Sequence, residues 1–141
     1  MNTLAQTKPG IKAFLMGAFI SGIIGAILNN VYGSLYSSVT GFSLPEVVNV
    51  FSITLASILP VLVGGLFYFA LSRFTPKATL IFIIVGAVFT FVSLASPLQP
   101  QLPDGSPTPG GFAGLTLPMH IISGVVVLYV LPRYVTKGKI V

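Results

Sequence analysis

The chain contains no cysteine and a single histidine, and charged residues make up only 6% of its 141 positions. Without thiols it cannot form disulfide bonds, iron–sulfur clusters, zinc–thiolate sites or a cysteine nucleophile. One imidazole is also too few for a zinc site, which needs three or four protein ligands. We therefore expect neither a metal nor a cofactor.

Hydrophobic residues make up 54% of the sequence. A soluble domain carries several times more charge on its surface. Uncharged stretches of about 20 apolar residues are typical of helices that cross a membrane. The composition predicts one all-α integral membrane domain over residues 1–141, with the lipid bilayer as its main partner.

Four apolar stretches predict four membrane-spanning helices that run up and down as a bundle. Their expected bounds are residues 13–32, 46–72, 78–96 and 118–134. A long connection, residues 97–117, is rich in proline and glycine. A segment of this kind is either a flexible tether or a lid over a binding site.

Local signals at the ends of these stretches support the bounds. Ser43 and Glu46 match a capping box at the start of the second helix. Thr75 precedes a proline and is the expected N-cap of the third helix. Pro97 and Pro132 are placed where the third and fourth helices are expected to end.

The basic and the acidic residues fall on opposite sides of the expected membrane domain. In a four-span arrangement, all seven basic residues fall on one side: Lys8, Lys12, Arg73, Lys77, Arg133, Lys137 and Lys139. Both acidic residues, Glu46 and Asp104, fall on the other. The positive-inside rule then places both termini in the cytoplasm of a bacterial cell, with the protein in the inner (plasma) membrane. The net charge of +5 does not indicate a nucleic-acid partner, because the basic residues form no contiguous patch.

Polar residues within the expected spans are the candidates for a ligand-binding site, because lipid disfavours them elsewhere. At about 1.5 Å per helical residue, several of them lie roughly 20 to 25 Å from the basic residues. The set that could converge on one pocket near the outer face is Asn29, Asn30, Glu46, Asn49, Thr90, Ser93 and His120. The alternative is structural: Glu46 only caps a helix, and His120 only hydrogen-bonds to Asn29, Asn30 or Ser93.

Small residues form a stripe along the first expected helix. The stripe contains Gly17, Ser21, Gly22, Gly25 and Ala26, at spacings that bring them to one side. Small residues allow a second helix to approach closely, so we expect the stripe to pack within the bundle. A seam between two copies of the chain is the alternative. In the second helix, Pro60 predicts a kink, which could also be a hinge.

The sequence resembles a family of small bacterial four-helix membrane proteins of unknown function. The resemblance is carried by Asn29 or Asn30 late in the first helix and by the basic link between the second and third. Ser93-Leu94 before the proline-rich loop, and Leu117-Pro118-Met119-His120 at the opening of the last helix, also match. The resemblance implies a four-span bundle, draws attention to His120 and supplies no activity.

These observations favour a non-catalytic multi-pass membrane protein. It would bind a small ligand or a lipid, or pack as a homo-oligomer or against a partner membrane subunit. The alternative is a transporter or a proton-coupled channel component that uses Glu46 and His120. A membrane enzyme with His120 as a base is less well supported, because no nucleophile or metal constellation accompanies it.

Overall fold

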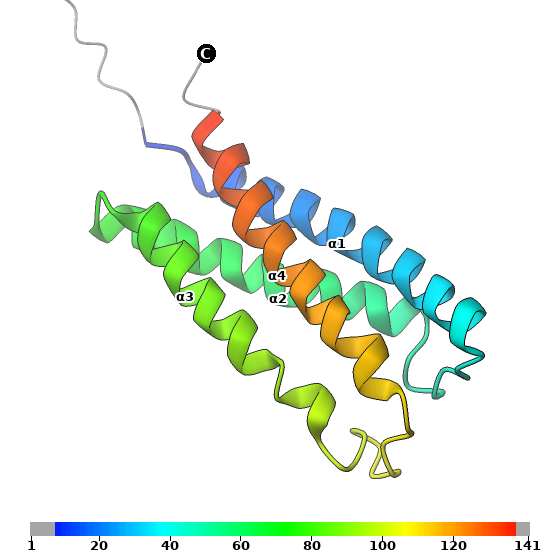
Figure 1. Ribbon diagram of the computed structural model, residues 1–141. Coiled ribbons are helices and arrows are strands. Elements are labelled where there is room, and N and C mark those ends of the chain that lie inside the picture. The colour runs from blue at the N-terminus through cyan, green and yellow to red at the C-terminus, as the bar shows by residue number, and fades with distance from the viewer. Residues whose placement is uncertain (1–7, 138–141) are drawn as a thin grey trace, which may run out of the picture.

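The computed structural model describes residues 8–137. Within them the chain forms α1 (Ile11–Thr40), α2 (Val50–Phe74), α3 (Ala78–Ser93), a 3-10 turn η1 (Ser96–Leu98) and α4 (Phe112–Lys137). Successive helices alternate in direction, as Figure 1 shows. The predicted all-helical fold with four helices is confirmed, and each helix is long and apolar enough to cross a membrane when η1 is counted with α3. The chain is a membrane protein.

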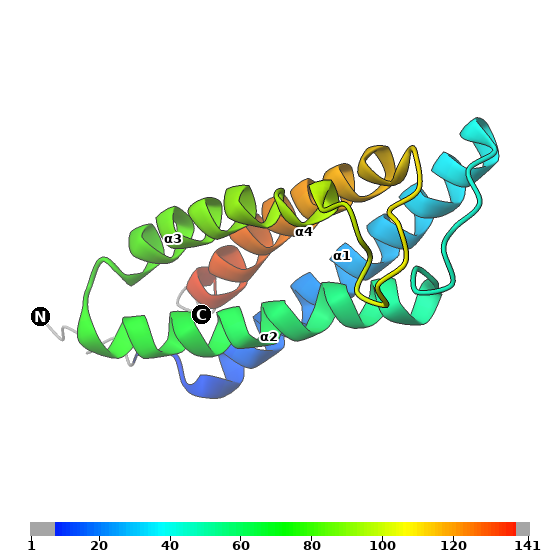
Figure 2. The same cartoon turned by 90° about the horizontal axis from the view of Figure 1, so that it is seen from below.

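α1 packs against both α2 and α4, and α3 packs against the same two helices. Figure 2 shows α3 running alongside α4, while α1 crosses α2. Both ends of the described chain and the link between α2 and α3 lie together (Figure 1). This end carries every basic residue that the structure describes, so we call it the basic end.

Two helices are longer than predicted. α1 ends at Thr40 rather than at residue 32, because the left-handed Gly41 (φ 69°) provides the C-cap and its N–H donates to Ser37 O. α4 begins at Phe112 rather than at residue 118, so Pro118 lies inside it. The prediction that Pro132 ends α4 is also wrong, since the helix continues to Lys137. Proline removes one hydrogen bond without necessarily ending a helix that its neighbours support.

The capping residues of α2 and α3 also differ from the prediction. α2 begins at Val50, where Asn49 and Ser52 form the capping box, so Glu46 lies outside the helix. Thr75 ends α2, and Lys77 occupies the N-cap position of α3. The predicted cap of α2 was wrong because Asn49 and Ser52 supply a complete capping box closer to its first turn. At α3 the Thr75 hydroxyl still accepts from the Lys77 N–H at 3.2 Å, although the helix itself begins later, at Ala78.

The stripe of small residues lies at the contacts of α1 with its neighbours. Gly17, Ser21, Gly22, Gly25 and Ala26 are all buried. A Cβ atom added to Gly22 would meet the backbone of Ile58 in α2 at 3.0 Å. Glycine therefore sets the distance between these helices.

A cluster of buried apolar side chains lies near the basic end. Phe14 of α1 contacts the Tyr68 ring edge to face, at a centroid distance of 4.9 Å. Tyr68 of α2 stacks on Phe82 of α3 at 4.6 Å. Leu131 and Val135 of α4 complete this cluster. Aromatic contacts from three helices and aliphatic packing from the fourth thus join all four elements.

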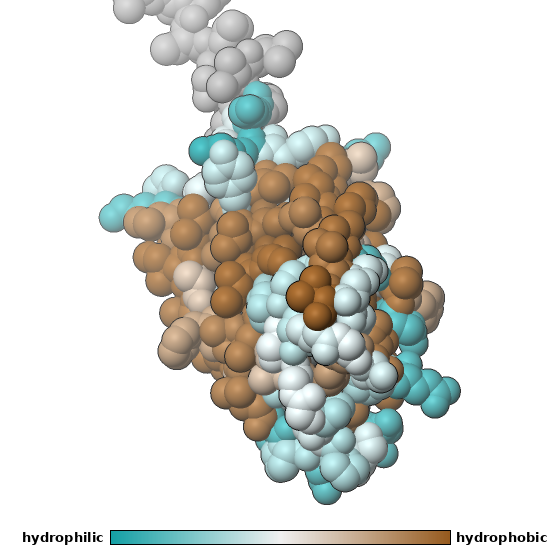
Figure 3. Space-filling model, turned by 45° about the vertical axis from the view of Figure 1, so that its right-hand side comes forward, coloured by the Kyte–Doolittle hydropathy of each residue, from teal (hydrophilic) through white to brown (hydrophobic). Residues whose placement is uncertain are grey.

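The surface between the two ends is hydrophobic. Figure 3 shows a broad apolar band separating hydrophilic ends. α3 contributes much of the exposed apolar surface, since only Ala78 and Phe82 of this helix are buried. Within a membrane such a band faces lipid, which solvates apolar side chains without cost.

The connection between η1 and α4 has local structure of its own. Gln101 and Pro107 form an isolated antiparallel bridge, and Leu102 beside it is only 6% exposed. Asp104 accepts hydrogen bonds from the backbone and the hydroxyl of Ser106, at 2.9 and 2.7 Å. These contacts make the segment a small folded turn.

Candidate functional site

Asn29 is the centre of the polar contacts inside the membrane domain. Its Nδ2 atom donates to Ser57 Oγ of α2 at 3.0 Å and to Ser123 Oγ of α4 at 2.8 Å. The side chain is almost fully buried, at 3% exposure. We call Asn29, Ser57 and Ser123 the Asn29 junction. It joins three helices through hydrogen bonds that lipid cannot replace.

His120 makes a separate contact between α3 and α4. Its Nδ1 atom lies 2.9 Å from Ser93 Oγ. Ser93 donates its own hydroxyl hydrogen to Thr90 O at 2.7 Å. The Ser93 oxygen must therefore accept from the ring, which makes Nδ1 the protonated nitrogen of His120.

Asn30 forms a third polar contact. Its Nδ2 atom donates to Ala26 O at 2.8 Å and to Thr54 Oγ1 at 3.2 Å. Thr90 of α3 donates to Gly86 O in its own helix at 2.8 Å. Each of these polar side chains thus has a structural partner close by.

Glu46 and Asn49 lie apart from the other predicted site residues. Both are exposed. Asn49 caps α2, and its Nδ2 atom donates to the backbone carbonyl of Glu46 at 3.0 Å. Among residues 8–137, no hydrogen bond connects the Glu46 side chain with His120. The seven predicted residues therefore divide into several local contacts.

Ser57 and Ser123 belong to the Asn29 junction, but sequence reasoning did not select them as site residues. A hydroxyl in an apolar helix was their only signal. That signal is weak, because serine usually satisfies itself on its own backbone, as Ser57 does by donating to Ile53 O at 2.8 Å.

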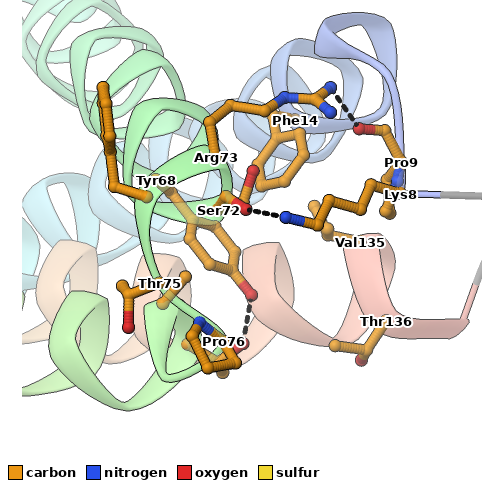
Figure 4. A pocket seen from close by; sticks show the side chains of 13 residues that line it. Lys8, Pro9, Phe14, Tyr68, Ser72, Arg73, Thr75, Pro76, Val135 and Thr136 are labelled. Atoms are coloured by element: carbon orange, nitrogen blue, oxygen red, sulfur yellow. Dashed lines mark hydrogen bonds between the residues drawn. The ribbon is translucent and has the colours of Figure 1, made fainter.

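A cavity of about 320 Å³ lies at the basic end, away from the predicted polar residues. Its walls come from the segment before α1, the end of α2, the start of α3 and the end of α4. Figure 4 shows Lys8 and Arg73 at its rim, with Tyr68 and Phe14 beside them. We call it the basic-end cavity.

Within residues 8–137, no acidic side chain pairs with the two cations of this cavity. Lys8 Nζ reaches Ser72 O at 3.5 Å, and Arg73 Nη2 donates to Pro9 O at 3.0 Å. These acceptors are backbone carbonyls, and the Arg73 guanidinium also lies over the Phe69 ring, 4.6 Å from its centroid. None of these partners carries a net charge. The acidic residues of the chain, Glu46 and Asp104, lie on connections at the opposite end. The positive charge therefore remains available to a ligand.

Two helix N-termini add to the positive potential at the basic end. α1 begins at Ile11 after the N-cap Gly10, and α3 begins at Ala78 after the N-cap Lys77. Neither has a capping side-chain hydrogen bond or an acid in its first turn. Each N-terminus carries about half a positive charge, which favours anions.

The wall of the basic-end cavity is mixed in polarity. Phe14, Ala78 and Val135 supply apolar surface, while Ser72 and Thr136 bring hydroxyl groups. The Tyr68 hydroxyl lies 2.6 Å from Thr79 Oγ1. An anionic group held at the rim would thus meet an apolar wall beside it.

A second, more open cavity of about 570 Å³ lies between α1 and α4 at the same end. Lys12 and Lys137 line it together with Met16 and Tyr134. In the sequence these lysines indicated only how the chain crosses the membrane. Residues 8–137 contain no group of three or more acidic or histidine side chains placed to hold a metal ion.

Comparison with known proteins gives a family without an assigned activity. The sequence matches a family of unknown function (DUF6069) over residues 4–137. Neither the curated proteins nor the solved structures include a match.

Proposed function

The chain belongs to the DUF6069 family of unknown function, and we propose that it is a non-catalytic membrane protein that binds an amphiphile with an anionic head group in the basic-end cavity. The observation that carries the proposal is that, within residues 8–137, Lys8 and Arg73 hydrogen-bond to backbone carbonyls and neither pairs with a carboxylate. Cations without a carboxylate partner, next to an apolar wall, match a molecule with a negative head and an apolar body.

The position of the cavity supports this proposal. Basic residues gather on the cytoplasmic side of membrane proteins. We infer that both termini lie there, in the inner membrane of a bacterium. Anionic phospholipids concentrate their charge at such a surface, and each basic residue near it contributes about 1 kcal/mol of attraction. An anionic lipid would therefore meet the cavity at its own depth in the bilayer.

Transport and catalysis have less support in the same geometry. Both hypotheses require Glu46 to act together with His120. Glu46 is exposed before α2, whereas His120 is bound to Ser93 between α3 and α4. Assembly with a second copy or another subunit also loses its main argument, because the stripe of small residues is buried within the chain itself.

Calorimetric titration of the detergent-solubilised full chain tests the proposal. The probes are dihexanoyl phosphatidic acid, dihexanoyl phosphatidylcholine and inorganic phosphate. We expect binding of the phosphatidic acid, much weaker binding of the zwitterionic lipid, and weak binding of phosphate alone because it lacks the apolar body. Equal affinity for both lipids would overturn the proposal.

Matched variants separate the cavity from general charge attraction. Arg73→Gln and Lys77→Gln each remove one positive charge from the basic end, but only Arg73 lines the cavity. We expect Arg73→Gln to weaken phosphatidic acid binding about tenfold, which corresponds to the loss of one charge-assisted contact of about 1.4 kcal/mol. Lys77→Gln should leave the affinity nearly unchanged. An equal loss in both variants would mean that the lipid responds only to net charge.

A further inference from the structure

One side of the buried Asn29 amide has no partner. Its nitrogen donates to Ser57 and Ser123, whereas its oxygen, Oδ1, is buried without any hydrogen bond. A buried acceptor left unpaired costs about 1–3 kcal/mol. With a side chain that is 3% exposed, solvent at the protein surface cannot compensate for this loss.

Exchanging the positions of the oxygen and nitrogen of the Asn29 amide would not satisfy its hydrogen bonds. The Ser57 hydroxyl already donates its hydrogen to Ile53 O at 2.8 Å, so it can only accept from Asn29. An inverted amide would place its oxygen against this acceptor and its nitrogen where Oδ1 now lies. The observed orientation is the favourable one, and Oδ1 requires a hydrogen-bond donor.

The same face of α1 has space one turn away, at Gly25. This glycine is buried, yet no neighbouring atom lies within 4 Å of the place where its side chain would begin. At Gly17, Gly22 and Gly33 the corresponding distances are 2.9, 3.0 and 2.9 Å. Helical side chains lean toward the N-terminus, so the Asn29 side chain leans toward the turn that holds Gly25.

We propose that a water molecule is bound between Gly25 and Asn29 and donates a hydrogen bond to Asn29 Oδ1. The backbone carbonyl oxygen of Gly25 is the second acceptor, because it lies one helical turn before Asn29 and keeps one lone pair free beside its hydrogen bond within the helix. A buried water molecule needs two or more such partners.

The chemistry of this site selects a neutral donor. An anion would be repelled by Oδ1, and a metal ion requires several more oxygen ligands than this row supplies. A cationic donor would be buried without a carboxylate, at a high desolvation cost. Water remains, and it makes the Asn29 junction a hydrated contact among α1, α2 and α4.

Magnetisation transfer from water to the Asn29 side-chain amide detects this molecule directly. In ¹⁵N-labelled full chain in nanodiscs, we expect cross-peaks of opposite sign in laboratory-frame and rotating-frame experiments, as for a long-lived water. We expect them to disappear in Gly25→Ala, where the methyl group takes the place of the water. A visible Asn29 amide without such cross-peaks in the wild-type chain would overturn the proposal.

A stability comparison provides the second test. In the wild-type background, Gly25→Ala should lower the thermal unfolding midpoint, because it leaves Asn29 Oδ1 unpaired. In an Asn29→Leu background the same substitution should raise the midpoint, because the methyl group then fills apolar space. A rise of equal size in both backgrounds would show that no water is displaced.

Discussion

Gly65 of α2 packs directly on Ala18 of α1: a Cβ atom added to Gly65 would lie 2.7 Å from the Ala18 Cβ and 3.1 Å from Phe14 O. The neighbouring Gly64 differs, because the nearest atom to its added Cβ is Phe82 Cε2 at 3.9 Å. Two adjacent glycines of one helix therefore have different roles. Gly65 permits the approach of α1, and Gly64 does not limit the packing.

Gly65→Ala should destabilise the protein, because the new methyl group meets the Ala18 Cβ and the Phe14 carbonyl oxygen, neither of which can move aside without shifting α1. Overpacking of this kind costs about 1–3 kcal/mol. Gly64→Ala is the matched control, and alanine's greater helix propensity should stabilise it by up to about 1 kcal/mol. The unfolding midpoint of each variant in the same detergent measures the difference. Equal midpoints would show that α1 and α2 are further apart than the structure indicates.

Tyr32 should compensate for the hydrogen bond that Pro118 removes. Pro118 has no N–H to donate to the carbonyl four residues earlier, and the Tyr32 hydroxyl donates to that carbonyl, Gly114 O, at 2.8 Å. Tyr32→Phe should therefore cost about 0.5–1.5 kcal/mol. In a Pro118→Ala background, where the backbone N–H is restored, the cost should be smaller.

A double-mutant cycle on unfolding free energies measures this coupling. Tyr36→Phe provides the control, because the Tyr36 hydroxyl donates to Gly111 O at 2.8 Å and that carbonyl does not depend on residue 118. Its cost should be the same in both backgrounds. A Tyr32→Phe cost that Pro118→Ala leaves unaltered would argue against compensation.

Asp104 should remain ionised to a lower pH than an ordinary aspartate. The Ser106 hydroxyl, and then the Ser106 backbone N–H, donate to its carboxylate and lower its pKa below 3.8. Because the folded-state pKa is the lower one, the stabilisation is present above the unfolded value. It is lost as the pH falls through the folded pKa.

The carboxyl ¹³C resonance of Asp104 followed against pH measures this shift. Ser106→Ala removes the hydroxyl contact and keeps the backbone contact, so the pKa should rise part of the way toward 3.8. Ser96→Ala, outside the turn, should leave it unchanged. An unchanged pKa in Ser106→Ala would mean that the hydroxyl does not hold the carboxylate.

Some contacts of the candidate site could be predicted from the sequence, and others could not. Ser93 was one of three partners expected for His120, and it is the one that the structure places against the ring. The partners of Asn29 could not be found in this way. Ser57 and Ser123 are 28 and 94 residues away along the chain, and only the rotation of α2 and α4 about their axes brings them to the same amide.

For the basic residues, too, the sequence predicted only part of the arrangement. Lys8 and Arg73 were expected on one side of the membrane, since charge and hydrophobic length alone determine that. Their arrangement around a cavity depends on where the end of α2 meets the segment before α1. That meeting is set by the Phe14, Tyr68 and Phe82 contacts, and pairwise side-chain packing has no periodic signal in a sequence.

The sequence by itself determined that four apolar helices cross the membrane, because backbone groups in lipid must be satisfied within each helix and each span must match the bilayer thickness. It did not determine where the helices end or which polar groups meet. Both depended on contacts between helices. Tyr32 of α1 donates a hydrogen bond to the carbonyl of α4 that Pro118 leaves unpaired. Asn29 reaches Ser57 and Ser123 only when α1, α2 and α4 have packed together. Hydrophobicity acts residue by residue, whereas hydrogen bonding and close packing exist only between surfaces that the fold has brought together.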